Sequence, residues 1–450
     1  MNAFDVVIIG SGSAGLAAAE SAKEAGAKRV AVVESAKRLG GECPNRGCVP
    51  SKALLRSVEL MMEARRAKEF GLRIPKTGFD FSALMRRKRK TVDALTGGGR
   101  MERILEHYGV DLIRGAAHFT GRHSIDVDGR PYEAKRFVIA TGSEPFIPPI
   151  PGLKESGYWT SDDIVKIRNV PTSLLVIGGG PIGAEWAQIL APLGTRVTII
   201  EAMSQLLPRE DPEIAHVVET SFKRQGIRVQ RNTKISSVRR HGKTFIVNGI
   251  RASALLVATG KRPAVGSLAL DAAGVSLSDR DAPILNEYLQ TSNPDIYVAG
   301  DAAAQMMFTH VAHLQGEIAG TNAVAGPKRA SNLDVIPRGT FCSPEVGSVG
   351  LTEQEARKQG RDVAVGRGEF SYLGKSLVSG ETDGLVKIVA DRKTKLILGG
   401  HIVGHSAAEL IHEVALAMFA KIPYTAIAEM VHAYPTYAEA VGVAASDIGT

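Results

Sequence analysis

The stretch FDVVIIGSGSAGLAAAESAKEAGAKRVAVVE, residues 4–34, decides the fold. It reads as an apolar strand, a glycine turn, an alanine-rich helix and a second apolar strand that ends in Glu34. The stretch SLLVIGGGPIGAEWAQILAPLGTRVTIIE, residues 173–201, repeats this order and ends in Glu201. The first glycine of the turn precedes the closing acid by 24 positions in one copy and by 23 in the other. One supersecondary unit therefore occurs twice, which predicts two Rossmann-like dinucleotide-binding domains.

Both turns have the pattern G-x-G-x-x-G, as GSGSAG at 10–15 and GGGPIG at 178–183. The first glycine allows the tight turn, the second lets backbone approach a pyrophosphate, and the third lets helix and strand pack closely. The pyrophosphate would lie at the helix N-terminus, where free N–H groups and the helix dipole favour anions. Glu34 and Glu201 fall where a carboxylate would accept a hydrogen bond from an adenosine ribose. Two such turns, each with its acid, indicate two nucleotide sites.

Further segments fit this plan. FVIATG at 137–142 and LLVATG at 255–260 are apolar strands that end in the same Ala-Thr-Gly turn. DIYVAGD at 295–301 is another short strand, and it ends on a carboxylate. The proline-rich stretch from 145 to 151 is typical of a linker between the two nucleotide units. After about residue 333 the dinucleotide patterns stop, and alternating strands and helices, including a helix near 407–420, predict a separate α+β domain.

Composition limits the functional classes. The chain of 450 residues is long enough for two to four domains. It has no apolar run of the roughly 18 residues that indicate a membrane span, and its N-terminus lacks the basic region of a signal peptide. We therefore expect a cytoplasmic protein without membrane or nucleic-acid partners. The net charge is +8, and the densest basic run, Arg86 to Lys90, is interpreted as a solvated helix face rather than a nucleic-acid patch.

Two of the three cysteines lie close together, Cys43 and Cys48 in GGECPNRGCVPSK at 40–52. In a regular helix, Cα atoms five positions apart are separated by roughly 8–9 Å, whereas a disulfide requires less than about 7 Å. If the two cysteines bridge, the stretch cannot be regular helix, and its prolines and glycine supply the breaks. The motif follows Glu34 by nine residues, so the pair should lie beside the first nucleotide. Two inert structural thiols are the alternative, but the paired nucleotide sites favour redox chemistry.

In these motifs the chain resembles the FAD-dependent pyridine nucleotide–disulfide oxidoreductases, which include dihydrolipoamide dehydrogenase, glutathione reductase and mercuric reductase. The resemblance covers essentially the whole chain, and FCSPE at 341–345 to VGLTE at 349–353 looks like the start of the family's dimerisation domain. It implies an α/β fold of two Rossmann-like domains, one for FAD and one for NAD, plus a C-terminal α+β dimerisation domain. The implied boundaries are 1–145 with 268–330 for a discontinuous FAD domain, 146–267 for the NAD(P) domain and 331–450 for dimerisation.

The resemblance also implies the residues that hold each cofactor. FAD would occupy the first unit, with Glu34 on its ribose and Asp301 near its ribityl chain, and NAD(P)H would occupy the second. The residues implied to bind FAD are Gly10, Gly12, Ser13, Ala14, Gly15, Glu34, Lys52, Gly115, Thr141, Gly142, Ser143, Asp301, Met307 and His310. Those implied to bind NAD(P)H are Gly178, Gly180, Pro181, Ile182, Gly183, Glu201 and Gly260.

The same resemblance assigns the reactive groups. Cys48 would be the charge-transfer thiolate over the flavin, and Cys43 would be the interchange thiol that meets the substrate. Lys52 and Glu185 resemble the family's ion pair near the flavin ring. Cys342 matches no redox position and is expected to be structural, and no metal site is expected.

The chain departs from the disulfide reductases of the family near its C-terminus. These carry His-Pro-Thr-x-x-Glu, in which the His accepts a proton, whereas this chain has Tyr434 at the His position and retains Glu439. His432 lies two residues earlier and is the alternative base. Mercuric reductase looks to have Tyr at this place too, but its C-terminal vicinal cysteines and its N-terminal metal-binding domain have no counterpart here.

We therefore expect an FAD-dependent NAD(P)H:disulfide oxidoreductase, most like dihydrolipoamide dehydrogenase, acting on a small thiol or disulfide or on a protein-bound lipoyl group. A mercuric-reductase-like reductase of a metal ion is the second hypothesis, and a flavin-binding redox sensor with little turnover is the third. NADH should be preferred over NADPH, because Glu201 would repel a 2′-phosphate and no Arg follows directly to pair with it. The active form is expected to be a homodimer.

Overall fold

The structure is a computed structural model that describes residues 3–448. By packing it divides into two units, one of residues 1–53, 85–146 and 260–333 and the other of 54–84, 147–259 and 334–450. Two of the five points at which the chain passes between the units lie within helices, α3 (Cys48–Arg66) and α4 (Phe81–Thr96). The division into three domains made from the sequence stays a prediction.

The first unit is built on a parallel sheet with strand order β3-β2-β1-β6-β16. β1, β2, β16 and the end of β6 are almost wholly buried because both faces of the sheet are covered there, whereas the edge strand β3 is partly exposed. The first part of β6 pairs instead with an antiparallel meander, β4-β5-β6. The strands are β1 (Phe4–Ile9), β2 (Val30–Glu34), β3 (Asp111–Arg114), β4 (Ala117–Gly121), β5 (Ser124–Val127), β6 (Arg130–Ile139) and β16 (Ile296–Val298).

Helices α1 (Ser13–Glu24) and α9 (Thr309–Ala325) pack against each other in this unit, although almost 300 residues separate them. Small residues allow the close approach. A Cβ at Gly316 would lie 2.3 Å from the carbonyl oxygen of Ala14, and one at Gly320 would lie 2.3 Å from that of Ala18. Only glycine fits at these two positions, which lie one helical turn apart. The remaining helices of the unit are α2 (Glu42–Asn45), α5 (Arg100–His107) and η3 (Gly300–Ala303).

The second unit contains a parallel sheet of order β10-β9-β8-β14. It repeats the strand–turn–helix–strand order of the first unit, as the sequence predicts, with α7 following β8. Its elements are α6 (Ser161–Ile164), β8 (Ser173–Ile177), α7 (Pro181–Leu190), η2 (Ala191–Leu193), β9 (Arg196–Ile200), α8 (Pro212–Arg224), β10 (Arg228–Gln230) and β14 (Ala254–Val257), with a separate meander of β11 (Val238–His241), β12 (Thr244–Val247) and β13 (Ile250–Ala252).

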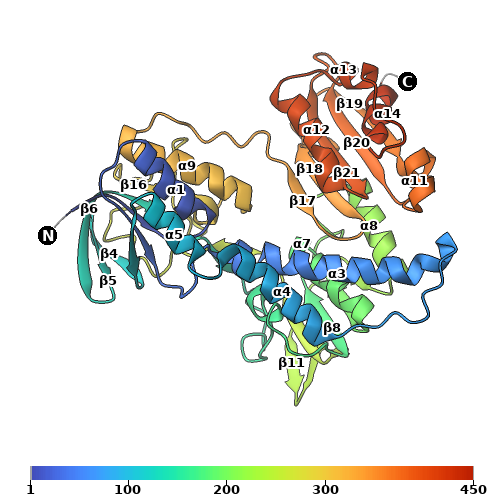
Figure 1. Cartoon of the computed structure of the whole chain (residues 1–450), viewed down its shortest axis with the longest axis horizontal. Coiled ribbons are helices and arrows are strands. Elements are labelled where there is room, and N and C mark those ends of the chain that lie inside the picture. Colours follow the sequence, from blue (N-terminus) through green and yellow to red (C-terminus); the bar gives the residue numbers. More distant parts are fainter. Residues whose placement is uncertain (1–2, 449–450) are drawn as a thin grey trace. The chain divides into compact units, whose positions relative to one another are not determined.

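The same unit holds a five-stranded sheet of order β17-β18-β21-β20-β19 (Figure 1). On one face the helices α12 and α14 cover Val386 and Ile402, so this face is apolar. The strands are β17 (Arg338–Thr340), β18 (Glu345–Gly350), β19 (Val363–Glu369), β20 (Leu385–Asp391) and β21 (Ile397–Gly404). The helices are α10 (Glu353–Lys358), η4 (Phe370–Tyr372), α11 (Gly374–Ser379), α12 (Ala407–Phe419), α13 (Tyr424–Glu429) and α14 (Glu439–Asp447), and α12 confirms the helix expected near 407–420.

A row of polar side chains crosses all five strands of this sheet at one register. The row consists of Arg338, Ser348, His401, Lys387 and Arg367, each the cross-strand partner of the next. Because side chains alternate along a strand, this row lies on the face opposite Val386 and Ile402. We call it the polar row.

Acidic residues at the start of α8 meet the polar row. Asp211, which is fully buried, and Glu213 pair with Lys387 at 3.0 and 2.6 Å. Burial alone would lower the pKa of Lys387, but hydrogen bonds with Glu213, Glu353 and Asp211 raise it. The hydrogen bond from Arg367, with that from Lys387, lowers the pKa of Glu213 to about 2. The C-terminal sheet is therefore joined to the start of α8 by charge pairs around the buried Lys387.

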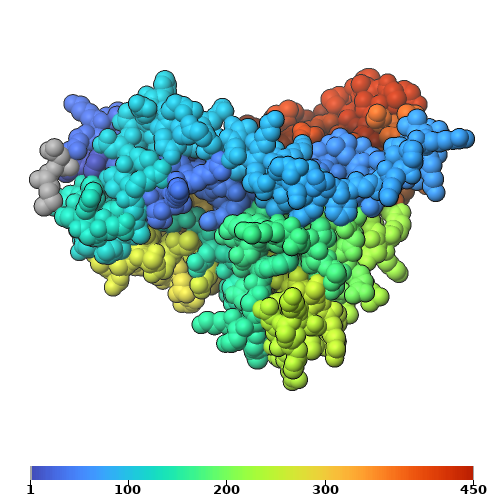
Figure 2. All heavy atoms as spheres, turned by 60° about the horizontal axis from the view of Figure 1, so that its bottom comes forward, coloured from blue at the N-terminus to red at the C-terminus, as the bar shows by residue number. Residues whose placement is uncertain are grey.

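The C-terminal end of α3 contacts the loop that follows α11. Figure 2 shows these residues, in blue, beside the orange segment around α11. Arg66 donates to Glu381 at 2.6 Å and to the carbonyl of Gly380 at 2.7 Å. The basic run lies on α4, where Arg86, Arg87, Arg89 and Lys90 are exposed as expected but Lys88 is buried. No helix among residues 3–448 combines the length and hydropathy of a membrane span.

Candidate active site

The first glycine turn has the geometry that its pattern predicts. Gly10 has φ +111°, a conformation that favours glycine, and a Cβ there would lie 2.3 Å from the carbonyl oxygen of Ala140. A Cβ at Gly15 would lie 1.9 Å from the carbonyl oxygen of Gly10, so the third glycine allows the helix to pack on the turn. At Gly12, the N-cap of α1, a Cβ would meet only Gly41, at 3.8 Å.

The carboxylate of Glu34 closes this turn. One oxygen accepts hydrogen bonds from the Ser11 amide at 2.9 Å and the Ser11 hydroxyl at 2.6 Å, and the other accepts from the amide of Ala36 at 2.7 Å. The second turn repeats the arrangement: the two oxygens of Glu201 accept from the amides of Gly179 at 2.6 Å and Met203 at 2.7 Å. Both acids are thus fixed beside their turns, where a ribose would be bound.

The second turn has the same backbone. Gly178 has φ +104°, and a Cβ at Gly183 would lie 2.1 Å from the carbonyl oxygen of Gly178. A Cβ at Gly180 would meet no atom within 4 Å, so this turn too leaves room for a backbone-bound pyrophosphate. Pro181 takes the first position of α7, where its missing N–H costs no hydrogen bond, and Ile182 follows it.

The residues predicted to line FAD gather in the first unit around this turn. The hydroxyl of Ser143 donates to Asp301 at 2.5 Å, and the hydroxyl of Ser13 donates to the carbonyl of Thr309 at 3.1 Å. The hydroxyl oxygen of Thr141 is buried and has no hydrogen-bond partner within residues 3–448, so it is available to a ligand. These groups fit the dinucleotide expected here.

The two thiols lie on consecutive helices that break between them. Cys43 lies in the short helix α2, and Cys48 is the first residue of α3. The interruption confirms that the stretch is no regular helix. Neither forms a disulfide in the structure; Cys43 is half-buried and Cys48 is exposed. A hydrogen bond with Cys48, followed by burial, raises the pKa of the Cys43 thiol.

Thr309 is a site residue that the sequence did not single out as a partner of the thiols. Its hydroxyl lies 3.7 Å from the sulfur of Cys48, and it is the first residue of α9. The N-termini of α3 and α9 therefore both meet at Cys48. Since helix N-termini favour anions, this setting stabilises negative charge on its sulfur. No local pattern could reveal this, because 261 positions separate the two residues.

The two C-terminal candidates for the proton acceptor, Tyr434 and His432, differ in their exposure to solvent. Tyr434 is 78% exposed, whereas His432 is largely buried and pairs through Nε2 with Glu413 at 3.0 Å. Glu439 accepts a hydrogen bond from the amide of Thr436 at 2.8 Å and begins α14. His432 is thus held by a partner, while Tyr434 is the accessible group.

The other predicted residues are distributed between the units. Lys52 lies on α3 in the first unit and Glu185 on α7 in the second, so their pairing stays a prediction. Glu185 accepts from the amide of Phe341 at 3.1 Å. Cys342 is buried, as expected of a structural thiol, and burial raises its pKa. Gly115, Met307 and His310 lie in the first unit, as does Gly260, whereas the other residues predicted for NAD(P)H lie in the second.

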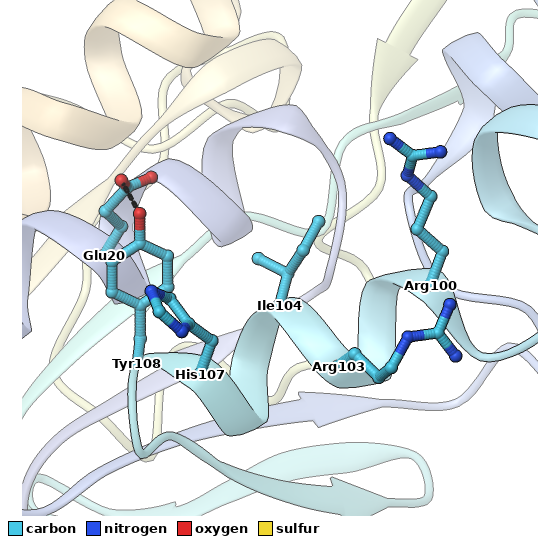
Figure 3. A pocket seen from close by; sticks show the side chains of 6 residues that line it. All are labelled: Glu20, Arg100, Arg103, Ile104, His107 and Tyr108. Atoms are coloured by element: carbon cyan, nitrogen blue, oxygen red, sulfur yellow. Dashed lines mark hydrogen bonds between the residues drawn. The ribbon is translucent and has the colours of Figure 1, made fainter.

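An open hollow of about 550 Å³ lies elsewhere in the first unit, along α5 (Figure 3). The hydroxyl of Tyr108 donates to Glu20 at one end, and Arg100 and Arg103 point away from this pair. Both arginines donate to carbonyl oxygens, those of Ala94 and Gly98. None of the predicted site residues lines the hollow, so the candidate active site remains the glycine turn and the thiol pair.

Comparison with protein families bears directly on this site. Residues 4–316 match the family described as pyridine nucleotide-disulphide oxidoreductase, and residues 336–445 match the dimerisation domain of the same family. The chain belongs to this family. The match confirms the predicted resemblance, fold class and enzyme class: the protein is an FAD-dependent oxidoreductase that passes electrons between NAD(P)H and a thiol or disulfide.

The chain is similar to two kinds of enzyme, mercuric reductases and dihydrolipoyl dehydrogenases. A mercuric reductase of Lysinibacillus sphaericus is 37% identical over 98% of this chain and 82% of its own length. A dihydrolipoyl dehydrogenase of Chlorobaculum tepidum is 38% identical over 99% of this chain and 97% of its own length. The solved Cu(II) complex of the HOCl-induced flavoprotein disulfide reductase RclA of Escherichia coli superposes with a TM-score of 0.89, at 29% identity over 99% of both chains.

Proposed function

We propose that Cys43 and Cys48 are the redox pair and that the enzyme exchanges electrons between NADH and a small disulfide or a protein-bound lipoyl group. The observation that carries this proposal is the placement of Cys48, where the N-termini of α3 and α9 meet. FAD, held by the first glycine turn and Glu34, would accept hydride from the nicotinamide and supply the electron pair that reduces the cysteine disulfide.

The two thiols have different tasks in this proposal. Cys43 loses a proton, attacks one sulfur of the substrate disulfide and forms a mixed disulfide, which releases one thiol. Cys48 then attacks the sulfur of Cys43, re-forms the Cys43–Cys48 disulfide and releases the second thiol. The raised pKa of Cys43 means that its proton must be taken up by a base or lost to a more alkaline solution.

Tyr434 is the accessible candidate for this proton, with Glu439 on the same segment. Tyr has a reference pKa of about 10 and is a poor proton acceptor at neutral pH. We infer slow turnover of disulfides near pH 7 and a stronger preference for an acceptor that needs no such base. The pairing of His432 with Glu413 argues against its movement into the role.

A metal ion as acceptor is therefore the second candidate function. The mercuric reductases among the relatives and the Cu(II) complex of RclA both concern soft or redox-active metal ions. A dithiol such as Cys43 with Cys48 suits such an ion, because thiolates are soft ligands. Here the metal would be the substrate. The remaining proposals are a homodimer formed through the dimerisation domain and a cytoplasmic location.

The test combines two cysteine variants with a choice of acceptors. On anaerobic addition of two electrons, the wild type should develop a long-wavelength charge-transfer band. Cys43→Ser should show this band without reductant, because Cys48 is then free as a thiolate, and Cys48→Ser should never show it. If both variants behave alike, the assigned roles are wrong. Turnover of NADH with lipoamide, glutathione disulfide, Hg(II) or Cu(II) then decides between disulfide and metal ion.

A further inference from the structure

Glu42, the residue before Cys43, forms an ion pair with Lys261. The pair is partly buried, with the two side chains 22% and 14% exposed, and 219 positions separate them in the sequence. Both residues belong to the first unit. Neither has a role in the thiol chemistry or the cofactor contacts described above.

The position of Glu42 is fixed by its neighbour. Gly41 has φ +71°, and its backbone lies against Gly12, so close that a Cβ on Gly41 would be 2.6 Å from the Cα of Gly12. Gly12 is the N-cap of α1 and the second glycine of the turn. Glu42 is the next residue along the chain, so the N-terminus of α1, which attracts anions, lies within reach of its side chain.

Lys261 comes from a strand far from Glu42 in the sequence. It lies on β15 (Lys261–Pro263), which pairs with β7 (Ser143–Pro145), and Lys261 is the cross-strand partner of Pro145. This ladder begins directly after the Thr141–Gly142 turn, whose Ser143 is bonded to Asp301. Lys261 is thus anchored on the segment that carries other predicted FAD-binding residues.

We propose that Lys261 is a positioning residue that holds the carboxylate of Glu42 away from the first glycine turn, so that this turn can accept the pyrophosphate of FAD. Without Lys261, the carboxylate of Glu42 would compete with the FAD pyrophosphate for the N-terminus of α1 and would repel the phosphates of the cofactor. The inference rests on the proposed placement of FAD in the first turn. The charge on Lys261 acts through Glu42 rather than by contacting FAD.

The experiment measures the Kd of FAD by diluting the purified holoprotein and recording flavin fluorescence as cofactor is released. Lys261→Met should weaken FAD binding by about tenfold or more, the effect of one partly screened like charge a few ångströms away. Lys261→Arg should bind like the wild type. Glu42→Gln combined with Lys261→Met should restore binding to within about threefold of the wild type, because the competing anion is gone.

Arg262→Met is the matched control. Arg262 is the next residue on β15 and pairs with Glu144, but both side chains are exposed, at 61% and 49%. Its loss should leave the Kd unchanged, as expected of an exposed pair. Circular dichroism of each variant shows whether it folds.

Two results would overturn the inference. If Lys261→Met binds FAD like the wild type, the ion pair has no part in cofactor binding. If the double variant binds as weakly as Lys261→Met, Lys261 acts on FAD directly and not through Glu42. A purified wild type that carries no FAD would instead refute the proposed function, and the two failures are therefore distinguishable.

Discussion

Cys43 and Cys48 are chemically the same side chain in two different electrostatic settings. Cys48 begins a helix of 19 residues and lies 3.7 Å from the hydroxyl of Thr309, at the start of another helix. Cys43 lies in a single helical turn, and its pKa is raised by the hydrogen bond with Cys48 and by burial. The anion therefore forms preferentially on Cys48, and Cys43 needs help to become a nucleophile.

A base at position 434 would give this help, but the chain has a tyrosine there, and the first prediction concerns this residue. Tyr434→His should raise turnover of lipoamide near pH 7 by about tenfold or more, because a positioned base of suitable pKa contributes 10²–10⁴-fold. Tyr434→Phe should change it little. In the wild type, turnover should rise with pH: the raised pKa of Cys43 leaves it protonated at neutral pH, and the thiolate fraction grows as the pH approaches that pKa. A pH series of kcat/KM for the three proteins measures both effects.

One outcome would reverse the order of the two proposed acceptors. If Tyr434→Phe loses most of its activity with a metal ion, the phenol is a working acid or ligand, and the metal ion moves ahead of the disulfide as substrate. His432→Gln serves as the comparison. It breaks the pair with Glu413 and should lower thermal stability, but it should not change the shape of the pH profile.

Glu201 carries the prediction on cofactor choice. Its carboxylate is bound by two backbone amides beside the second turn and is almost fully buried, so it cannot turn away from a 2′-phosphate. The kcat/KM for NADH should exceed that for NADPH by about tenfold or more. Glu201→Gln should reduce this ratio by removing the negative charge. Glu34→Gln, the equivalent change at the first turn, should leave the ratio unchanged, and a wild-type preference for NADPH would refute the assignment.

At the scale of elements, the polar row shows how the C-terminal sheet uses its two faces. Small and apolar residues face α12 and α14, while the row from Arg338 to Arg367 faces the start of α8. Burial lowers the pKa of His401, which keeps this member neutral among the charged groups. The charged members of the polar row are thus paired with opposite charges, and removing one partner should lower the stability of the fold.

The prediction for this element is a stability difference between two variants. Lys387→Met removes a buried cation and leaves the fully buried Asp211 without it, which should cost about 3–5 kcal/mol. Arg392→Met breaks the exposed pair with Asp362 and should cost less than about 1 kcal/mol. Calorimetry of the holoproteins compares their unfolding temperatures. Equal shifts would show that the buried pair contributes no more than a surface pair.

Contacts between residues far apart in the sequence are the part of the structure that the sequence did not predict. The glycine turns with Glu34 and Glu201, and the helix near 407–420, could be predicted because each depends on residues close in sequence. The contacts of Thr309 with Cys48, Lys261 with Glu42 and Lys387 with Asp211 join positions 261, 219 and 176 apart. A single sequence gives no sign of such pairs, because neither partner has a local pattern that requires the other.

At the scale of the whole molecule, the expected homodimer decides how the site can be tested. Deleting the chain after about residue 430 is a tempting experiment, but α14 belongs to the core of the C-terminal sheet. Its Ala440 and Ala444 carbonyls lie so close to Gly368 and Gly366 that a Cβ there would be 2.2 and 2.0 Å away. The truncation would unfold this sheet, and loss of activity would say nothing about shared sites.

A surface substitution avoids this difficulty and gives the last prediction. Leu416 and Phe419 lie one turn apart on α12, and they and Val431 are 63%, 77% and 94% exposed in the single chain. Such apolar exposure within a dimerisation domain marks the surface that a second copy should cover. Phe419→Asp should raise the dimer Kd by about 100-fold or more, because it places an unpaired carboxylate in that contact.

If the partner's Tyr434 completes each disulfide site, the Phe419→Asp monomer should retain FAD and its reduction by NADH but lose disulfide turnover. Sedimentation, flavin absorbance and both assays measured on one sample test this. Ile284→Asp, a change at an apolar residue that is 52% exposed in the first unit, is the control and should leave dimer and turnover intact. A monomer that still reduces lipoamide at the wild-type rate would show that each chain has a complete site, because NADH would then reach the disulfide through one copy alone.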